Sequence, residues 1–130
     1  MQRPRRRFGE GGTATTQLVV VFPAVFFMLM LVVQFGLWYH GSHLATAAAQ
    51  EGARAARVEG ATAGQGKQVA QAFLDELNSE LIQGVVVRAE RDGEHVRVQV
   101  TGASIEVVPG FSIPIRAVSD APVERFRGDQ

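Results

Sequence analysis

The stretch Leu18–Tyr39, LVVVFPAVFFMLMLVVQFGLWY, decides the fold of this 130-residue chain. Its first sixteen residues, up to Val33, contain no charged or polar side chain. As an α-helix the 22 residues would be roughly 33 Å long, and the hydrocarbon core of a bilayer is about 30 Å thick. Because only a helix satisfies all of its backbone polar groups within one segment in lipid, the stretch predicts a transmembrane helix. The alternative is a buried core helix, but so small a chain could not cover it on all sides.

The segment before the span is basic. Residues 1–12, MQRPRRRFGEGG, hold four arginines and one glutamate, and they form a leader too polar and glycine-rich to fold alone. The positive-inside rule predicts a cytoplasmic N-terminus and an extracytoplasmic C-terminal part, beginning near residue 40. A cleaved export signal, twin-arginine or general, is the alternative. The apolar core is too long for one, and even the first A-x-A after it, Ala45–Ala47, lies well past the span.

The composition excludes several classes of protein. The formal net charge is zero, so there is no basic footprint for nucleic acid, and the absence of cysteine excludes disulfides and thiolate metal sites. His40 and His43 could reach one metal ion from adjacent turns, but no third ligand is near them. His95 is expected beside Glu90 on a sheet surface. No set of acid, base and nucleophile is visible, so we expect neither an enzyme nor a cofactor.

The residues after the span predict more helix. Alanine dominates Gly41–Glu59, so helix should continue from the membrane into water, making 13–59 one helical segment. Its small residues form a narrow face that another helix can approach closely. The face consists of Leu44 and the small residues Ala48, Gly52 or Ala53, Ala55 and Ala56. Glycines make 60–66 a flexible link, and Lys67–Ile82 has helical periodicity, with Phe73 and Leu77 on its apolar stripe.

A β-hairpin is predicted next. Val85–Arg91 and Glu94–Val100 flank Asp92-Gly93, a dipeptide typical of two-residue hairpin turns. The expected pairs are Arg91 with Glu94, Ala89 with Val96, Val87 with Val98 and Val85 with Val100, with Arg88 opposite Arg97 on the other face. This register gives one wholly apolar face, which should receive the Phe73/Leu77 stripe.

The rest of the chain completes a small domain. Ser104–Val108 is a candidate third strand, Pro109-Gly110 a turn, and Ile113–Ser119 a fourth strand. Segment 67–126 is therefore predicted to be an extracytoplasmic α+β head with an antiparallel sheet, and 127–130 a tail.

The N-terminal half of the chain resembles the TadE-like family, the minor pseudopilins of tight-adherence (Flp-type) pilus assembly systems. The similar features are the basic leader ending in Gly12, the small segment Thr13–Thr16, the early proline in Val21–Pro23, and residues 48–56, AAQEGARAA. Residues 48–56 are the most specific part. Gln17 and residues 34–40 are similar to the actinobacterial branch.

This resemblance implies a pilin-like fold, a processing site and a set of partners. A prepilin peptidase would cut after Gly12 and leave Thr13 as the new N-terminus. The family commonly has glutamate five residues after the cut, where pilins contact a neighbouring subunit, and this chain has Gln17 there. The implied partners are membrane lipid, other pilins or pseudopilins, the prepilin peptidase and the assembly platform proteins. Two other hypotheses stay open: an unprocessed single-pass protein with a partner-binding head, and an exported domain released by signal peptidase.

Overall fold

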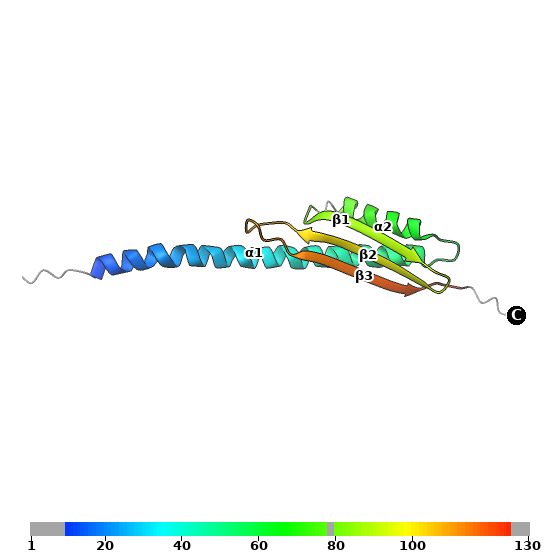
Figure 1. The fold of residues 1–130 in the computed structure, drawn as a ribbon, viewed down its shortest axis with the longest axis horizontal. Helices are drawn as coiled ribbons and strands as arrows, with labels where there is room; N and C mark the ends of the chain where they lie inside the picture. The colour runs from blue at the N-terminus through cyan, green and yellow to red at the C-terminus, as the bar shows by residue number, and fades with distance from the viewer. Residues whose placement is uncertain (1–9, 78–79, 126–130) are drawn as a thin grey trace, which may run out of the picture.

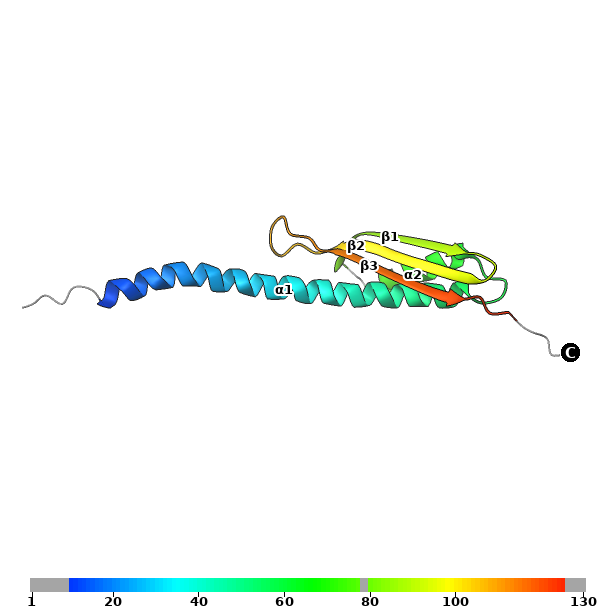
Figure 2. The same ribbon diagram turned by 60° about the horizontal axis from the view of Figure 1, so that its bottom comes forward.

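The computed structural model describes residues 10–77 and 80–125 of the chain. It contains two helices, α1 (Glu10–Ala56) and α2 (Ala63–Glu76), and three strands, β1 (Ile82–Arg91), β2 (His95–Ser104) and β3 (Pro114–Pro122). The strands form one antiparallel sheet in the order β1-β2-β3. The sheet lies along the C-terminal half of α1, and the N-terminal half of α1 projects away from it (Figures 1 and 2). The predicted α+β class with a long N-terminal helix is confirmed.

Helix α1 is continuous and serves two purposes. It passes without a break through Pro23, Gly36 and Gly41 and ends at Ala56, three residues before the predicted end. Its C-terminal half carries small side chains that are fully or almost fully buried in the core of the head: Ala45, Ala48, Ala49, Ala53 and Ala56. Because small residues let backbones approach closely, this predicted face packs against the sheet and α2 of the same chain.

The link between the helices is shorter than predicted. Helix α2 begins at Ala63, so more than half of the expected 60–66 link is helical. A capping box explains the early start: the Thr62 hydroxyl accepts from Gln65 N–H, and the Gln65 side chain accepts from Thr62 N–H. The C-terminal part of the predicted helix is also wrong, since α2 ends at Glu76 and Ile82 begins β1; residues 78–79 lie outside the described residues.

The hairpin register differs from the predicted one by two residues. Arg91 pairs with Val96, and Glu90 pairs with Arg97. The cause is Asp92, which is the first residue of the turn: its carboxylate accepts from the N–H groups of Glu94 at 2.8 Å and His95 at 2.6 Å. Because strand side chains alternate with period two, the shift leaves each side chain on its predicted face. The buried valines of the inner face are Val87, Val96, Val98 and Val100.

The inner face of the sheet packs mainly on α1, not on the predicted stripe of the second helix. Ala70 and Leu74 of α2 are buried and Phe73 is partly buried, but Leu77 is 49% exposed. Helix α2 lies next to β1, while α1 lies against β2 and β3. Sequence periodicity identified the apolar faces of both helices but not which helix the sheet packs against.

The predicted third strand does not form. Strand β2 continues to Ser104, and residues 105–113 form a loop before β3. The predicted Pro109-Gly110 turn is present: Phe111 N–H donates to the Val108 carbonyl at 3.0 Å, and Gly110 has a φ of 77°. The predicted fourth strand corresponds to β3. Leader residues 1–9 and the tail 127–130 lie outside the described residues.

Candidate functional site

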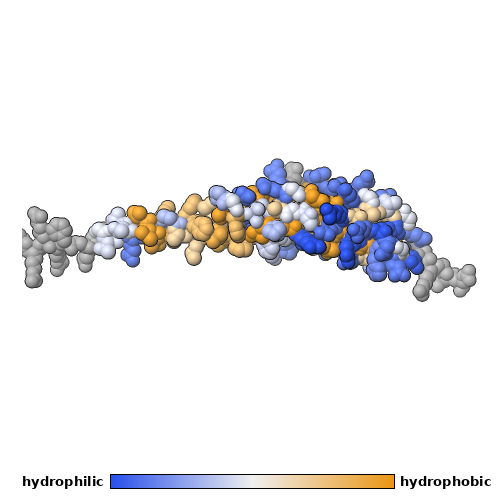
Figure 3. Space-filling model, viewed as in Figure 1, coloured by the Kyte–Doolittle hydropathy of each residue, from blue (hydrophilic) through white to orange (hydrophobic). Residues whose placement is uncertain are grey.

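The N-terminal half of α1 is a continuous apolar surface. Its large apolar side chains from Leu18 to Phe35 are mostly more than half exposed, and hydrophobic colour covers most of the projecting helix beyond its first turns in Figure 3. Among the described residues, one helix, Gly12–Ala56 within α1, is long and apolar enough to cross a membrane. An exposed apolar surface of this size fits a single-pass membrane protein, because lipid or neighbouring helices must cover it.

The three residues expected to act in processing and assembly lie together at the start of this surface. Gly12, Thr13 and Gln17 are exposed within the first turns of α1. The Thr16 hydroxyl donates to the Gly12 carbonyl at 2.8 Å, so the peptide group at the expected cut belongs to a regular helical turn. A peptidase that needs an extended backbone would have to unwind this turn first.

A second site, which the sequence analysis missed, centres on Gln34. This side chain is fully buried although it lies in the apolar half of α1. Its Nε2 donates to Ser104 Oγ at 3.0 Å and to the Ile105 carbonyl at 2.7 Å. Its Oε1 accepts from the N–H groups of Val107 at 2.7 Å and Val108 at 3.3 Å. One amide therefore holds the 105–113 loop against the helix.

Neighbouring contacts strengthen this attachment. Ser104 Oγ also accepts from Ile113 N–H at 3.1 Å, and Ser104 N–H donates to the Ile113 carbonyl at 2.9 Å, which closes the base of the loop. One helical turn after Gln34, Trp38 Nε1 donates to the Pro114 carbonyl at 3.2 Å. We call Gln34, Trp38 and Ser104 the loop clamp. It fixes the end of the sheet to the last turns of the predicted membrane span.

One sequence signal pointed to the clamp. Gln34 is the first polar residue after sixteen apolar ones, and a polar side chain in such a run usually has a partner. The sequence does not say which partner, because Ser104 and the loop lie about 70 residues further along the chain. Only the fold brings them together.

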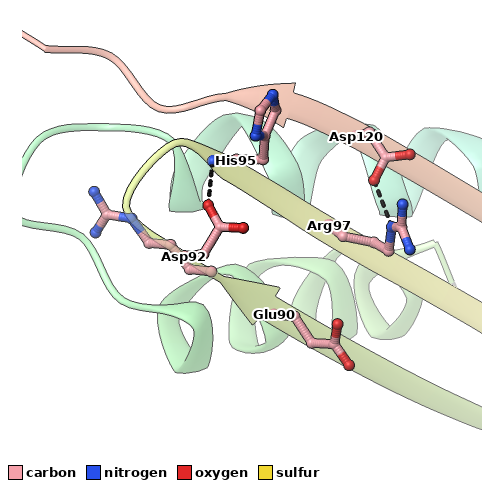
Figure 4. A pocket seen from close by; sticks show the side chains of 6 residues that line it. Glu90, Asp92, His95, Arg97 and Asp120 are labelled. Carbon is pink, nitrogen blue, oxygen red and sulfur yellow. Dashed lines mark hydrogen bonds and ion pairs between the residues drawn. The ribbon is translucent and has the colours of Figure 1, made fainter.

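A polar hollow lies on the outer face of the sheet, near the hairpin turn (Figure 4). Its lining residues are Glu90, Arg91, Asp92, His95, Arg97 and Asp120. Arg97 Nε donates to Asp120 Oδ1 at 2.7 Å, and this hydrogen bond, together with the negative charge, raises the pKa of Arg97 above its ordinary value. Hydrogen bonds from the N–H groups of Glu94 and then His95 lower the pKa of Asp92. These bonds order the turn, and the side chains are solvated.

The histidines do not form a metal centre in the described part of the chain. His43 packs edge-on against Tyr39, with ring centroids 4.4 Å apart. His95 pairs across the sheet with Pro122, so the expected neighbour Glu90 faces Arg97 instead. No group of three or more His, Cys, Asp or Glu side chains within residues 10–77 and 80–125 is placed to hold one ion.

Comparison with known families identifies the N-terminal segment. A family model described as TadE-like protein matches residues 12–54. The match covers most of α1, including the apolar surface, Gln34 and most of the small-residue face. Neither the curated proteins nor the solved structures gave a match to the chain.

Proposed function

We propose that this chain, whose residues 12–54 match a family model described as TadE-like protein, is a minor pseudopilin of a Tad-type pilus system. In this role it assists the assembly of a Flp-type pilus or a related secretion apparatus. Such components are structural, so the chain would work by binding neighbours in the membrane. Its partners would be lipid, other pilins or pseudopilins, the prepilin peptidase and the assembly platform proteins.

The observation that carries this proposal is the single helix that belongs to both the apolar surface and the head. Residues from Leu18 to Val33 project from the head with their side chains exposed, and residues 45–56 of the same helix form its core. A helix of this kind can anchor a subunit in lipid and later pack among the helices of other subunits. The basic leader favours a cytoplasmic N-terminus and an extracytoplasmic head.

Removal of the leader would prepare the helix for assembly. Cleavage between Gly12 and Thr13 removes four arginines and one glutamate, which changes the formal charge of the chain from 0 to −3. The cationic anchor on the cytoplasmic side is then lost, so extraction of the helix from the membrane costs less. Since the junction lies in a helical turn, the peptidase would bind a locally unwound form.

Gln17 would make the contact with the next subunit. Its carbonyl oxygen can accept a hydrogen bond from the ammonium group at a neighbour's Thr13, but a neutral amide cannot neutralise that charge. This difference from the usual glutamate favours a minor or initiating subunit over one that forms a long fibre alone. Gln17→Arg tests the contact, because it places a like charge opposite the ammonium. Complex recovery should fall with Gln17→Arg and stay unchanged with Gln50→Arg, which alters an exposed glutamine in the head.

The N-terminus of the protein recovered from native membranes tests the processing step. We expect mass spectrometry and N-terminal sequencing to find Thr13, and to find the leader retained in Gly12→Leu. A Cβ at Gly12 meets no atom within 4 Å, so loss of processing would not reflect a steric clash. Gly36→Leu is the matched control, since Gly36 is equally open and lies far from the cut. An intact Met1 in the unaltered protein would instead support an unprocessed single-pass protein whose head binds a partner.

A further inference from the structure

The 105–113 loop, IEVVPGFSI, is an apolar segment at the edge of the head. It extends past the ends of β2 and β3, beside α1 and toward its projecting half (Figures 1 and 2). Phe111 is 42% exposed, Pro109 is exposed, and Val107 and Val108 are half-buried. The neighbouring surface of α1 is also apolar and exposed, notably at Val33 and Phe35. The tip of the loop is thus continuous with the surface expected to face lipid.

The length of the apolar run decides how deep this region lies. Leu18–Val33 is sixteen residues, or roughly 24 Å of helix. A bilayer core is about 30 Å thick, so about four more residues of helix must lie within it. On the N-terminal side the next residues, Thr13–Gln17, are mostly polar. On the other side Phe35, Leu37 and Trp38 are apolar or interfacial. Insertion of Phe35, Leu37 and Trp38 into the bilayer is more favourable in free energy than insertion of Thr13–Gln17. The loop clamp therefore lies at the membrane boundary.

The loop is suited to this position because several of its backbone groups have partners within the protein. Gln34 accepts from Val107 and Val108 N–H and donates to the Ile105 carbonyl. Phe111 N–H donates to Val108. In a medium poor in water these bonds avoid the cost of unpaired polar groups. The exposed Glu106 carboxylate must stay in water, which limits the loop to the interfacial layer.

We infer that the loop tip, Val107–Phe111, inserts into the interface of the leaflet next to the head and forms a second membrane contact beside the helix. Lipid is its partner, held by apolar side chains at a depth fixed through the loop clamp. This contact rests on the membrane span of α1, but it does not depend on leader cleavage or on a role in pili. It seats the head directly on the membrane surface.

Site-directed spin labelling of the full chain in phosphatidylcholine vesicles tests this contact. The chain has no cysteine, so one nitroxide can be attached at Phe111→Cys without further changes. Val118→Cys is the matched control, because Val118 is 44% exposed but lies on β3, away from the loop. Leu29→Cys, in the span, gives the lipid reference. Power saturation measures collisions of each label with oxygen, which concentrates in lipid, and with a water-soluble nickel chelate.

We expect the ratio of oxygen to nickel collisions at position 111 to be several-fold higher than at 118 and to approach that at 29. Adding Gln34→Leu should lower the ratio at 111 by releasing the loop, while the ratio at 29 stays constant. A label at Val108→Cys repeats the test if the change at Phe111 alters folding. A ratio at 111 equal to that at 118 would overturn the inference. So would exclusion of both reagents at high lipid dilution, because protein would then cover the tip.

Discussion

Replacement of Gln34 by leucine removes the centre of the loop clamp. The four hydrogen bonds of this amide are each worth about 1 kcal/mol net, so their loss costs about 4 kcal/mol. Ser104 keeps its bond from Ile113 N–H, so the groups left without their partner are the Ile105 carbonyl and the N–H groups of Val107 and Val108. The larger apolar side chain returns about 1–2 kcal/mol. The difference predicts a loss of about 2–3 kcal/mol in the free energy of unfolding of the head.

Urea unfolding of the full chain in detergent micelles, followed by circular dichroism, measures this loss. Amide hydrogen exchange locates it, since Val107 and Val108 should exchange much faster in the variant while the amides of β2 do so only through unfolding of the whole head. Gln50→Leu makes the same chemical change at an exposed position of the same helix and should stay within about 0.5 kcal/mol of the unaltered protein. Equal effects of the two substitutions would refute the clamp.

Two further predictions concern the head. Gly66→Ala should destabilise it by about 1–3 kcal/mol, because a Cβ there would lie 2.7 Å from Ala56 Cβ and 2.8 Å from the Gly52 carbonyl oxygen. Gly64→Ala, whose nearest contact is 3.8 Å away, should stabilise it by up to about 1 kcal/mol, and effects of the same sign in thermal unfolding would contradict the close helix contact. Asp92 has a lowered pKa, so its contribution to stability is complete above its ordinary pKa of about 3.8 and is lost as pH falls through the lowered value. The unfolding temperature should therefore fall less steeply between pH 7 and about pH 2 in Asp92→Asn than in the unaltered protein. Identical profiles of unfolding temperature against pH would exclude this role of Asp92.

The long helix and the two faces of the hairpin could be predicted because both follow from local periodicity. The span, its alanine-rich continuation and the alternation of valines each repeat within a few residues. The register was missed because it depends on one side chain, Asp92, which accepts hydrogen bonds from the turn and moves the pairing by two residues. The predicted register also placed Arg88 opposite Arg97, a like-charge pair that the observed register replaces with Glu90 and Arg97.

The errors elsewhere come from contacts between distant segments. Ser104–Val108 has the composition of a strand, but Gln34 supplies the hydrogen bonds that a neighbouring strand would have supplied. Gly64 and Gly66 indicated a flexible link, yet Gly66 is helical because it packs against Gly52, where a larger residue would not fit. The positions expected for processing and subunit contact, Gly12, Thr13 and Gln17, are exposed near the start of α1. Their roles remain predictions.

The unbroken passage of α1 from the span into the core has a mechanical consequence. Gly41, just after the predicted span, is buried, and a Cβ added there would lie 3.0 Å from Ile115 Cδ1, so the helix is held at that point by β3. The head therefore cannot swivel independently of the span. Successive residues of an α-helix are rotated by about 100° about the helix axis. A neighbouring protein that binds one side of the apolar half therefore fixes the orientation of the sheet about the helix axis. Deleting one residue of the helix between that binding surface and the head would rotate the sheet by about 100° relative to the neighbour.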